Sequence, residues 1–197
     1  MTQDGVNKGR RRFLYIAAGA MGAAGAVGVA TPFVRSWYPS EKAKAVGAPV
    51  DVDISTLESG EMRIAEWRGK PIFIVRRTET MIENLRKDEL TSRLADPESE
   101  VASQQPEYAQ NTLRSRAEDL LVLEGVCTHL GCSPQFRPEV EPQPFDANWM
   151  GGFFCPCHGS RFDLAGRVYK GVPAPTNLVV PPHVVQGSVL TVGEESA

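Results

Sequence analysis

The chain has few side chains that bind metals well: its 197 residues include only four cysteines and three histidines. No two cysteines form a C-x-x-C pair, the spacing that structural zinc sites prefer. No stripe of Lys and Arg interleaved with aromatic residues is present, so nucleic acid is not expected as a partner. No internal repeat is visible, and the length fits one domain with appendages.

Acidic residues are scarce in the first 35 positions, where Asp4 stands against five basic residues, a balance of +4. The whole chain carries a formal charge of −3, so the remainder carries −7. An acidic body behind a basic leader indicates an exported domain.

Charged residues are also missing from Phe13–Val34, a run of 22 residues. At ~1.5 Å per helical residue, this run spans the roughly 30 Å hydrocarbon core of a bilayer. Its start overlaps Arg10-Arg11-Arg12-Phe13-Leu14, which matches the twin-arginine export signal R-R-x-F-L. A cleaved signal peptide would have a shorter apolar run followed by a small-x-small site, whereas Thr31-Pro32-Phe33 stands here. We therefore predict an uncleaved transmembrane anchor helix at residues 13–34.

The segments on either side of this anchor are expected to lie on opposite sides of the membrane. The positive-inside rule places the basic leader, residues 1–12, in the cytoplasm, and the rest of the chain then lies in the periplasm. Trp37 and Tyr38 suit the membrane interface, and small polar residues without an apolar face follow them. Residues 35–48 are therefore predicted to be a flexible tether, with a passive linker as the alternative.

The remaining residues, 49–197, predict a mainly β head domain. Short runs of β-forming residues are bounded by Gly, Pro and Asn, which is typical of antiparallel sheets. These runs are Val50–Ile54, Arg63–Glu66, Ile72–Arg76, Leu120–Leu123, Gly152–Phe154, Arg167–Tyr169, Leu178–Val180, His183–Gln186 and Val189–Val192. A small helical insert follows the third run, where Thr80-Met81-Ile82-Glu83 has the form of a capping box.

Two short boxes hold all four cysteines and two of the three histidines: Cys127-Thr128-His129-Leu130-Gly131-Cys132 and Cys155-Pro156-Cys157-His158-Gly159-Ser160. Together they offer two ligands more than a four-coordinate metal needs. The economical solution is one Cys and one His from each box on a metal centre, which leaves two cysteines over. A structural zinc site is the first alternative. A purely disulfide-bonded framework is the second, but it does not explain a His close to Cys in both boxes.

The boxes CTHLGC and CPCHGS resemble those of the Rieske iron–sulfur subunit of the cytochrome bc complexes. The stretches Trp67–Pro71, Asp96-Pro97 and Pro173-Ala174-Pro175 are also similar to this family. The resemblance covers nearly the whole chain. It implies a Rieske-type antiparallel β sandwich as the head, preceded by one N-terminal transmembrane helix, with a tether that lets the head swing between two partners.

The resemblance also implies a ligand set and a disulfide. The ligands of one 2Fe–2S cluster would be Cys127, His129, Cys155 and His158. The remaining pair, Cys132 and Cys157, would form a disulfide that ties the two loops, residues 127–132 and 155–160, together. Neutral imidazole in place of thiolate on one iron would raise the potential of the cluster above that of an all-Cys ferredoxin.

Other box residues take roles from the same resemblance. Ser160 would donate a hydrogen bond to a bridging sulfide, and Gly131 would let a backbone N–H approach the cluster sulfurs. Leu130 would lie at an exposed apolar tip that docks on a membrane partner. His158, with His129 beside it, would receive a hydrogen bond from a quinol, which then gives up an electron and a proton.

The implied function is electron transfer from ubiquinol, at the cytochrome b subunit, to a c-type haem subunit (cytochrome c1). The protein would then be the iron–sulfur subunit of a proton-translocating quinol–cytochrome c reductase, in a dimeric complex of a bacterial inner membrane. Two alternatives stay open: a Rieske subunit of another exported oxidoreductase, such as an arsenite oxidase, and a non-redox metal-stabilised binding module. The tether, the Asp96-Pro97 insert and the match of both boxes favour the first.

The sequence departs from the family pattern at two places. Many high-potential members have Tyr two residues beyond the box-two Ser, where this chain has Phe162. The 22 residues between Cys132 and Cys155 form a longer stretch than in mitochondrial forms, and the sequence assigns no role to it.

Overall fold

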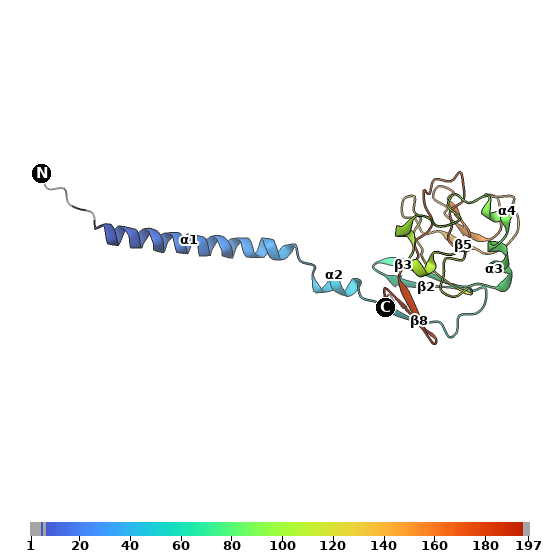
Figure 1. The fold of residues 1–197 in the computed structure, drawn as a ribbon, viewed down its shortest axis with the longest axis horizontal. Helices are drawn as coiled ribbons and strands as arrows, with labels where there is room; N and C mark the ends of the chain where they lie inside the picture. The colour runs from blue at the N-terminus through green and yellow to red at the C-terminus, as the bar shows by residue number, and fades with distance from the viewer. Residues whose placement is uncertain (1–4, 6, 195–197) are drawn as a thin grey trace. The chain divides into compact units, whose positions relative to one another are not determined.

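A computed structural model describes residue 5 and residues 7–194. The chain divides into two compact units, with the division between Ala45 and Val46. The first unit is helical, and the second is a β domain with short helices (Figure 1).

The first unit is dominated by helix α1 (Lys8–Ser36), which is 29 residues long and has no buried residue. Its N-cap is Asn7, whose side chain accepts a hydrogen bond from the backbone N–H of Arg10 at 3.1 Å, as N-cap residues do. The helix is long and apolar enough to cross a membrane. It extends the predicted 13–34 segment at both ends, because the capped basic cluster is itself helical.

A second helix, α2 (Glu41–Val46), lies in the segment that the sequence predicts to be a flexible tether. The Ser40 hydroxyl accepts a hydrogen bond from the N–H of Ala43 at 3.1 Å, and Lys44 pairs with Glu41 at 2.7 Å. A capping Ser ahead of Ala-rich sequence favours a helical turn, so residues 35–48 are not irregular throughout.

The described part of the second unit contains three antiparallel, three-stranded sheets, in the orders β1-β9-β8, β2-β3-β4 and β5-β6-β7. The strands are β1 (Val50–Asp53), β2 (Met62–Trp67), β3 (Lys70–Arg76), β4 (Leu120–Glu124), β5 (Gln135–Arg137), β6 (Gly152–Phe154), β7 (Arg161–Phe162), β8 (His183–Gln186) and β9 (Val189–Val192). Between β3 and β4 lie the helices α3 (Glu79–Leu85), α4 (Asp88–Thr91), η1 (Ala102–Gln104) and η2 (Glu107–Ala109).

Strands β3 and β4 separate two cores because their side chains alternate between faces. Phe73 and Leu123 lie in one core, which also contains Cys127 and Cys155. Ile72 and Val122 face the other way, into the core that β1 and β9 cover. The β2-β3-β4 sheet is therefore the inner layer of a sandwich, and one of its faces supports the cysteine boxes.

Two predicted strands, Arg167–Tyr169 and Leu178–Val180, are absent from the described head. Only single bridges occur, at Val168 and Tyr169. The backbone groups find other partners: the N–H of Val168 donates to the side chain of Asn177, and the N–H of Leu178 donates to the carbonyl of Gly166, both at 2.8 Å. Conversely, the short strands β5 and β7 are not evident from the sequence.

The predicted capping box at Thr80 is also wrong. The N-cap lies two residues earlier, at Thr78, whose hydroxyl accepts a hydrogen bond from the N–H of Met81 at 3.2 Å, and helix α3 begins at Glu79. Thr80 is inside the helix. The helical insert itself is present, and Leu85, Leu90 and Leu94 bury its apolar side in a third core.

Gly152, in β6, has no room for a side chain. Its φ is 150°, and a Cβ there would lie 2.0 Å from the backbone oxygen of Phe162. We expect Gly152→Ala to lower the free energy of unfolding of the head by more than about 4 kcal/mol, the range of exceptional single substitutions.

Gly69→Ala is the matched control, because Gly69 has a φ of 71° but no described atom within 4 Å of its Cβ position. It should cost only about 1–2 kcal/mol of left-handed strain. Denaturant unfolding of both variants measures the difference, and equal costs would contradict it.

Candidate metal centre

The two boxes form the same backbone turn, although they lie in different connections. Loop one, residues 127–132, follows β4, and loop two, residues 155–160, joins β6 to β7. In each, the N–H of the first residue donates to the carbonyl of the sixth, and the N–H of the fifth donates to the carbonyl of the first. The four bonds are Cys127 N–Cys132 O at 2.8 Å, Gly131 N–Cys127 O at 2.9 Å, Cys155 N–Ser160 O at 2.8 Å and Gly159 N–Cys155 O at 3.0 Å.

The fifth residue of each turn must be glycine for conformational reasons. Gly131 has a φ of 84° and Gly159 a φ of 78°, values that glycine adopts without steric cost. No described atom lies within 4 Å of a Cβ built at either position, so the backbone angle is the constraint and close packing is not.

The two cysteines outside the disulfide, Cys127 and Cys155, are each 2% exposed and lie in one core. Burial raises the pKa of the Cys127 thiol, and the neighbouring Cys155 thiol acts in the same direction. The backbone N–H of His129 and the hydroxyl of Ser160 act on this pKa in the opposite direction. Two buried thiols side by side are costly as free thiolates, and bound metal charge removes that cost.

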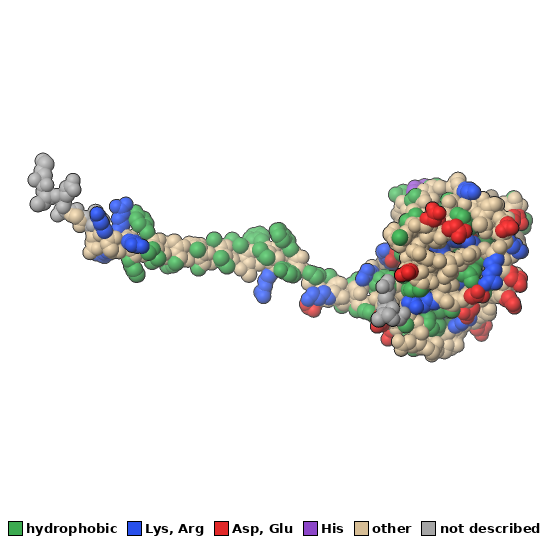
Figure 2. Space-filling model, in the orientation of Figure 1, with side chains coloured by type: hydrophobic (Ala, Val, Ile, Leu, Met, Phe, Trp, Pro, Cys, Tyr) green, Lys and Arg blue, Asp and Glu red, His purple; other side chains and the backbone are tan. Residues whose placement is uncertain are grey.

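The two box histidines meet at the surface. The ring centroids of His129 and His158 are 4.8 Å apart, and the ring planes are at 87° to each other. His129 is half-buried and His158 is exposed. Figure 2 shows a histidine side chain at the surface of the head beside hydrophobic side chains. The loops thus place two thiols inside and two imidazoles outside, a donor set that fits a 2Fe–2S cluster with two Cys on one iron and two His on the other.

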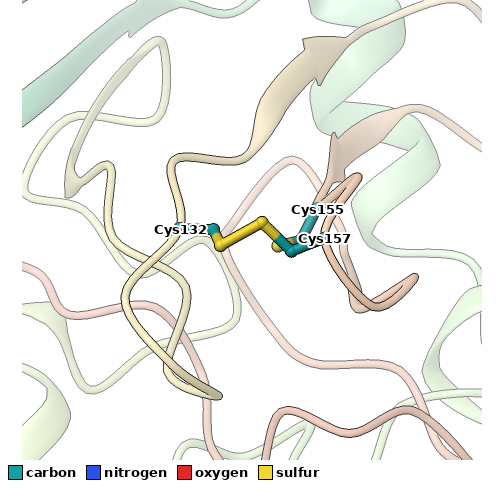
Figure 3. A group of neighbouring side chains, drawn as sticks. All are labelled: Cys132, Cys155 and Cys157. Carbon is teal, nitrogen blue, oxygen red and sulfur yellow. A yellow bond between two sulfur atoms is a disulfide. The ribbon is translucent and has the colours of Figure 1, made fainter.

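The other two cysteines, Cys132 and Cys157, form a disulfide between the loops, with an S–S distance of 2.11 Å. The sulfur of Cys155 lies within 4.8 Å of both disulfide sulfurs (Figure 3). Disulfide sulfurs carry no thiolate charge, and the thiolate is the form that binds metals. Of these three cysteines, only Cys155 is therefore available as a ligand.

A third segment, around Pro173-Ala174-Pro175, binds both loops. The hydroxyl of Thr128 donates to the carbonyl of Thr176 at 2.7 Å, and the N–H of Ala174 donates to the hydroxyl oxygen of Ser160 at 3.0 Å. This proline stretch resembles a family in sequence, but its residues alone predict neither contact. The two prolines restrict the segment's backbone, and they were the only local signal for it.

The comparisons with known proteins agree with this geometry. Residues 48–182 match the family model described as "Rieske [2Fe-2S] domain", and residues 1–40 match "Ubiquitinol-cytochrome C reductase Fe-S subunit TAT signal". The ubiquinol–cytochrome c reductase iron–sulfur subunit of Allochromatium vinosum is 51% identical over 99% of this chain and 93% of its own length. The chain belongs to the Rieske iron–sulfur subunits of ubiquinol–cytochrome c reductase.

A more distant relative carries the same description. The Blastochloris viridis subunit is 42% identical and covers 92% of this chain and 90% of its own length. A chain in a solved structure titled "Hyperthermophilic respiratory Complex III" is 31% identical, covers 89% of this chain and 98% of that chain, and has a TM-score of 0.48. Family membership decides among the three functions that the sequence left open, in favour of the first, and the Rieske domain carries a 2Fe–2S cluster.

Within this Rieske head, the remaining predicted site residues differ in exposure. Leu130, predicted to lie at an exposed tip, is 71% exposed, whereas Ser160 is fully buried. Phe162, in β7, is also fully buried and shares a core with Cys127 and Cys155. His183, to which the sequence analysis gave no role, is buried and contacts Tyr108 at 3.1 Å through Nδ1.

The position of Phe162 generates a prediction about the reduction potential. Phe162→Tyr adds a hydroxyl in the core that contains Cys127 and Cys155, the predicted ligands. A hydrogen bond from this hydroxyl to a ligand sulfur would favour the more electron-rich reduced cluster. A hydrogen bond to a charged group contributes about 1.5–3 kcal/mol. Only the part that differs between redox states moves the potential, so we expect a rise of roughly tens of millivolts. Ser160→Ala should lower the potential for the converse reason. Voltammetry of both variants tests this, and an unchanged or lower potential in the Tyr variant would contradict it.

Proposed function

We propose that Cys127 and Cys155 hold one iron of the cluster and that His129 and His158 hold the other. The contact between the two histidine rings, with their centroids 4.8 Å apart, carries this proposal, because the rings come from different loops. The buried, adjacent thiols of Cys127 and Cys155 support it. The disulfide between Cys132 and Cys157 removes the other two sulfurs from competition.

The exposed side of this site fits electron transfer from ubiquinol. When bound, the cluster supplies a one-electron acceptor. His158 presents its ring to the surface, where a ring nitrogen accepts a hydrogen bond from a quinol hydroxyl and takes up its proton. Leu130, exposed beside His129 in the same loop, supplies an apolar contact for the quinol-oxidation site of cytochrome b. The head then passes the electron to the haem of a c-type subunit, cytochrome c1.

The leader and the disulfide support a particular arrangement across the membrane. Helix α1 is the anchor in the plasma membrane of a bacterium, residues 1–12 stay in the cytoplasm, and the head lies in the periplasm. The twin-arginine route supports this arrangement, because a head that folds before export can receive its cluster in the cytoplasm. The periplasm also permits the Cys132–Cys157 disulfide. The basic side chains near the start of α1 are visible in Figure 2.

The ligand assignment predicts which substitutions remove the cluster. His129→Ala, His158→Ala, Cys127→Ser and Cys155→Ser should each abolish the EPR signal of the reduced cluster and the ubiquinol–cytochrome c activity of the purified complex. No spare thiol or imidazole replaces them, because the other two cysteines form the disulfide.

The disulfide variants are the control for these ligand variants. Cys132→Ser and Cys157→Ser should keep the signal but lower the stability of the cluster and its potential. Co-purification of the wild-type chain with b- and c-type haem tests the partner assignment. An iron ligand at Cys132, or a chain that purifies without both haems, would contradict the proposal.

The anchor predicts the form of the mature protein. Replacing Arg10 and Arg11 together by Lys should block export, since the twin-arginine signal needs both guanidinium groups. The mature wild-type chain should retain residues 13–34. N-terminal sequencing of the membrane-bound protein checks this, and a chain that begins after Ala30 would mean that the helix is a cleaved signal.

A further inference from the structure

The long stretch between the boxes, to which the sequence assigned no role, forms a closed loop against the head. It leaves β5 at Arg137 and enters β6 at Gly152, and the indole N–H of Trp149 donates to the carbonyl of Arg137 at 3.0 Å. Gln143 and Asp146 exchange two backbone hydrogen bonds, at 2.9 and 3.0 Å. Trp149 is 2% exposed. Residues 138–150, the inter-box loop, are therefore anchored at their base.

Cluster loop two depends on a very short hairpin. Residues 155–160 connect β6 to β7, and the last strand pair before the loop is Phe154 opposite Arg161. Strand β7 has only two residues. A ladder this short is marginal by itself, so contacts from outside the hairpin must hold the loop in place.

Two consecutive residues of the inter-box loop contact both members of this closing pair. The ring of Phe145 stacks on the ring of Phe154, with centroids 3.9 Å apart and planes at 8°. The carboxylate of Asp146 accepts a hydrogen bond from the guanidinium of Arg161 at 2.9 Å. The same guanidinium nitrogen also donates to the carbonyl of Phe145 at 3.4 Å.

Asp146 links this contact to a third part of the head. Its side chain is 6% exposed, and the oxygen that pairs with Arg161 also pairs with Arg93 at 2.5 Å. Arg93 lies just beyond α4 and places its guanidinium over the ring of Tyr169, as Arg161 does. One buried carboxylate therefore balances two guanidinium groups from segments far apart in the sequence. Removing one partner of a buried ion pair strongly destabilises the folded protein, because the other charge is left uncompensated.

The tip of the inter-box loop has a different character. Glu139, Val140 and Glu141 are exposed, and none of the contacts to the hairpin involves them. The contacts are concentrated at the residues beside cluster loop two, which is not the pattern of a loop that merely covers surface.

We propose that Phe145 and Asp146 are positioning residues for cluster loop two. These two residues hold Phe154 and Arg161 at the ends of loop two. They thereby keep the Cys and His ligands of loop two opposite those of loop one. This inference rests on the proposed ligand set. Without either contact, the hairpin opens more often and the cluster is released faster.

The test compares Asp146→Asn and Phe145→Leu in the full chain within the purified complex. Both should release the cluster faster by on the order of tenfold, the effect of losing one partner of a largely buried contact. The cluster that remains should show an altered EPR line shape, because its histidine ligands are less uniformly placed. Cluster loss is followed by the bleaching of visible absorbance during mild heating.

Two controls separate positioning from general stability. Phe145→Tyr keeps the ring stack and should behave as wild type. Arg86→Gln breaks an exposed ion pair with Glu118, 2.6 Å in length and in another part of the head, and should change neither the release rate nor the line shape. Wild-type release and line shape in both test variants would overturn the proposal, as would equally fast release in Arg86→Gln.

Failure of the ligand assignment would look different. If His158 were not a ligand, His158→Ala would keep its cluster signal whatever the inter-box loop does. If only the positioning role were wrong, His158→Ala would lose the signal while Asp146→Asn kept the wild-type release rate. The two proposals are therefore separable in one set of preparations.

Discussion

The covalent bond between Cys132 and Cys157, which lie 25 positions apart in the chain, joins the two loops. Each loop is built on the same turn, in which a glycine with positive φ lets the chain fold back on its first cysteine. Neither loop alone offers more than one free thiol and one imidazole. The site exists only because the two loops face each other. The disulfide, the proline segment and the inner sheet each hold the loops in this position.

Burial divides the site into two chemically distinct halves. The thiols of Cys127 and Cys155 lie in an apolar core, where charge is poorly solvated and a metal is the available counter-charge. The rings of His129 and His158 lie at the surface, where His129 is half-buried and His158 is exposed. A site with its thiols buried and its imidazoles exposed fits a subunit that accepts electrons from ubiquinol and keeps water away from its sulfurs.

Sequence patterns anticipated the elements whose signal is local. The continuous apolar runs of β3 and β4, both buried on two faces, were recognised as strands, and the run without charges was recognised as a helix. Strands β5 and β7 have only three and two residues, and they were missed because so short a segment shows no alternation of apolar and polar residues. The strand predicted around Val168 is wrong for a different reason. Its residues favour a strand, but the backbone N–H of Val168 donates to the side chain of Asn177 instead of to a neighbouring strand.

The sequence by itself determined the chemistry of this protein: Cys and His at fixed spacings in two boxes, a twin-arginine leader and an apolar run of membrane length. These features are short-range, and covalent spacing alone defines them. Only the tertiary structure decided which side chains meet. The stack of Phe145 on Phe154 and the position of Asp146 between Arg93 and Arg161 join segments far apart in the chain. Such contacts depend on how sheets and loops pack in three dimensions, and no local pattern of residues encodes that packing.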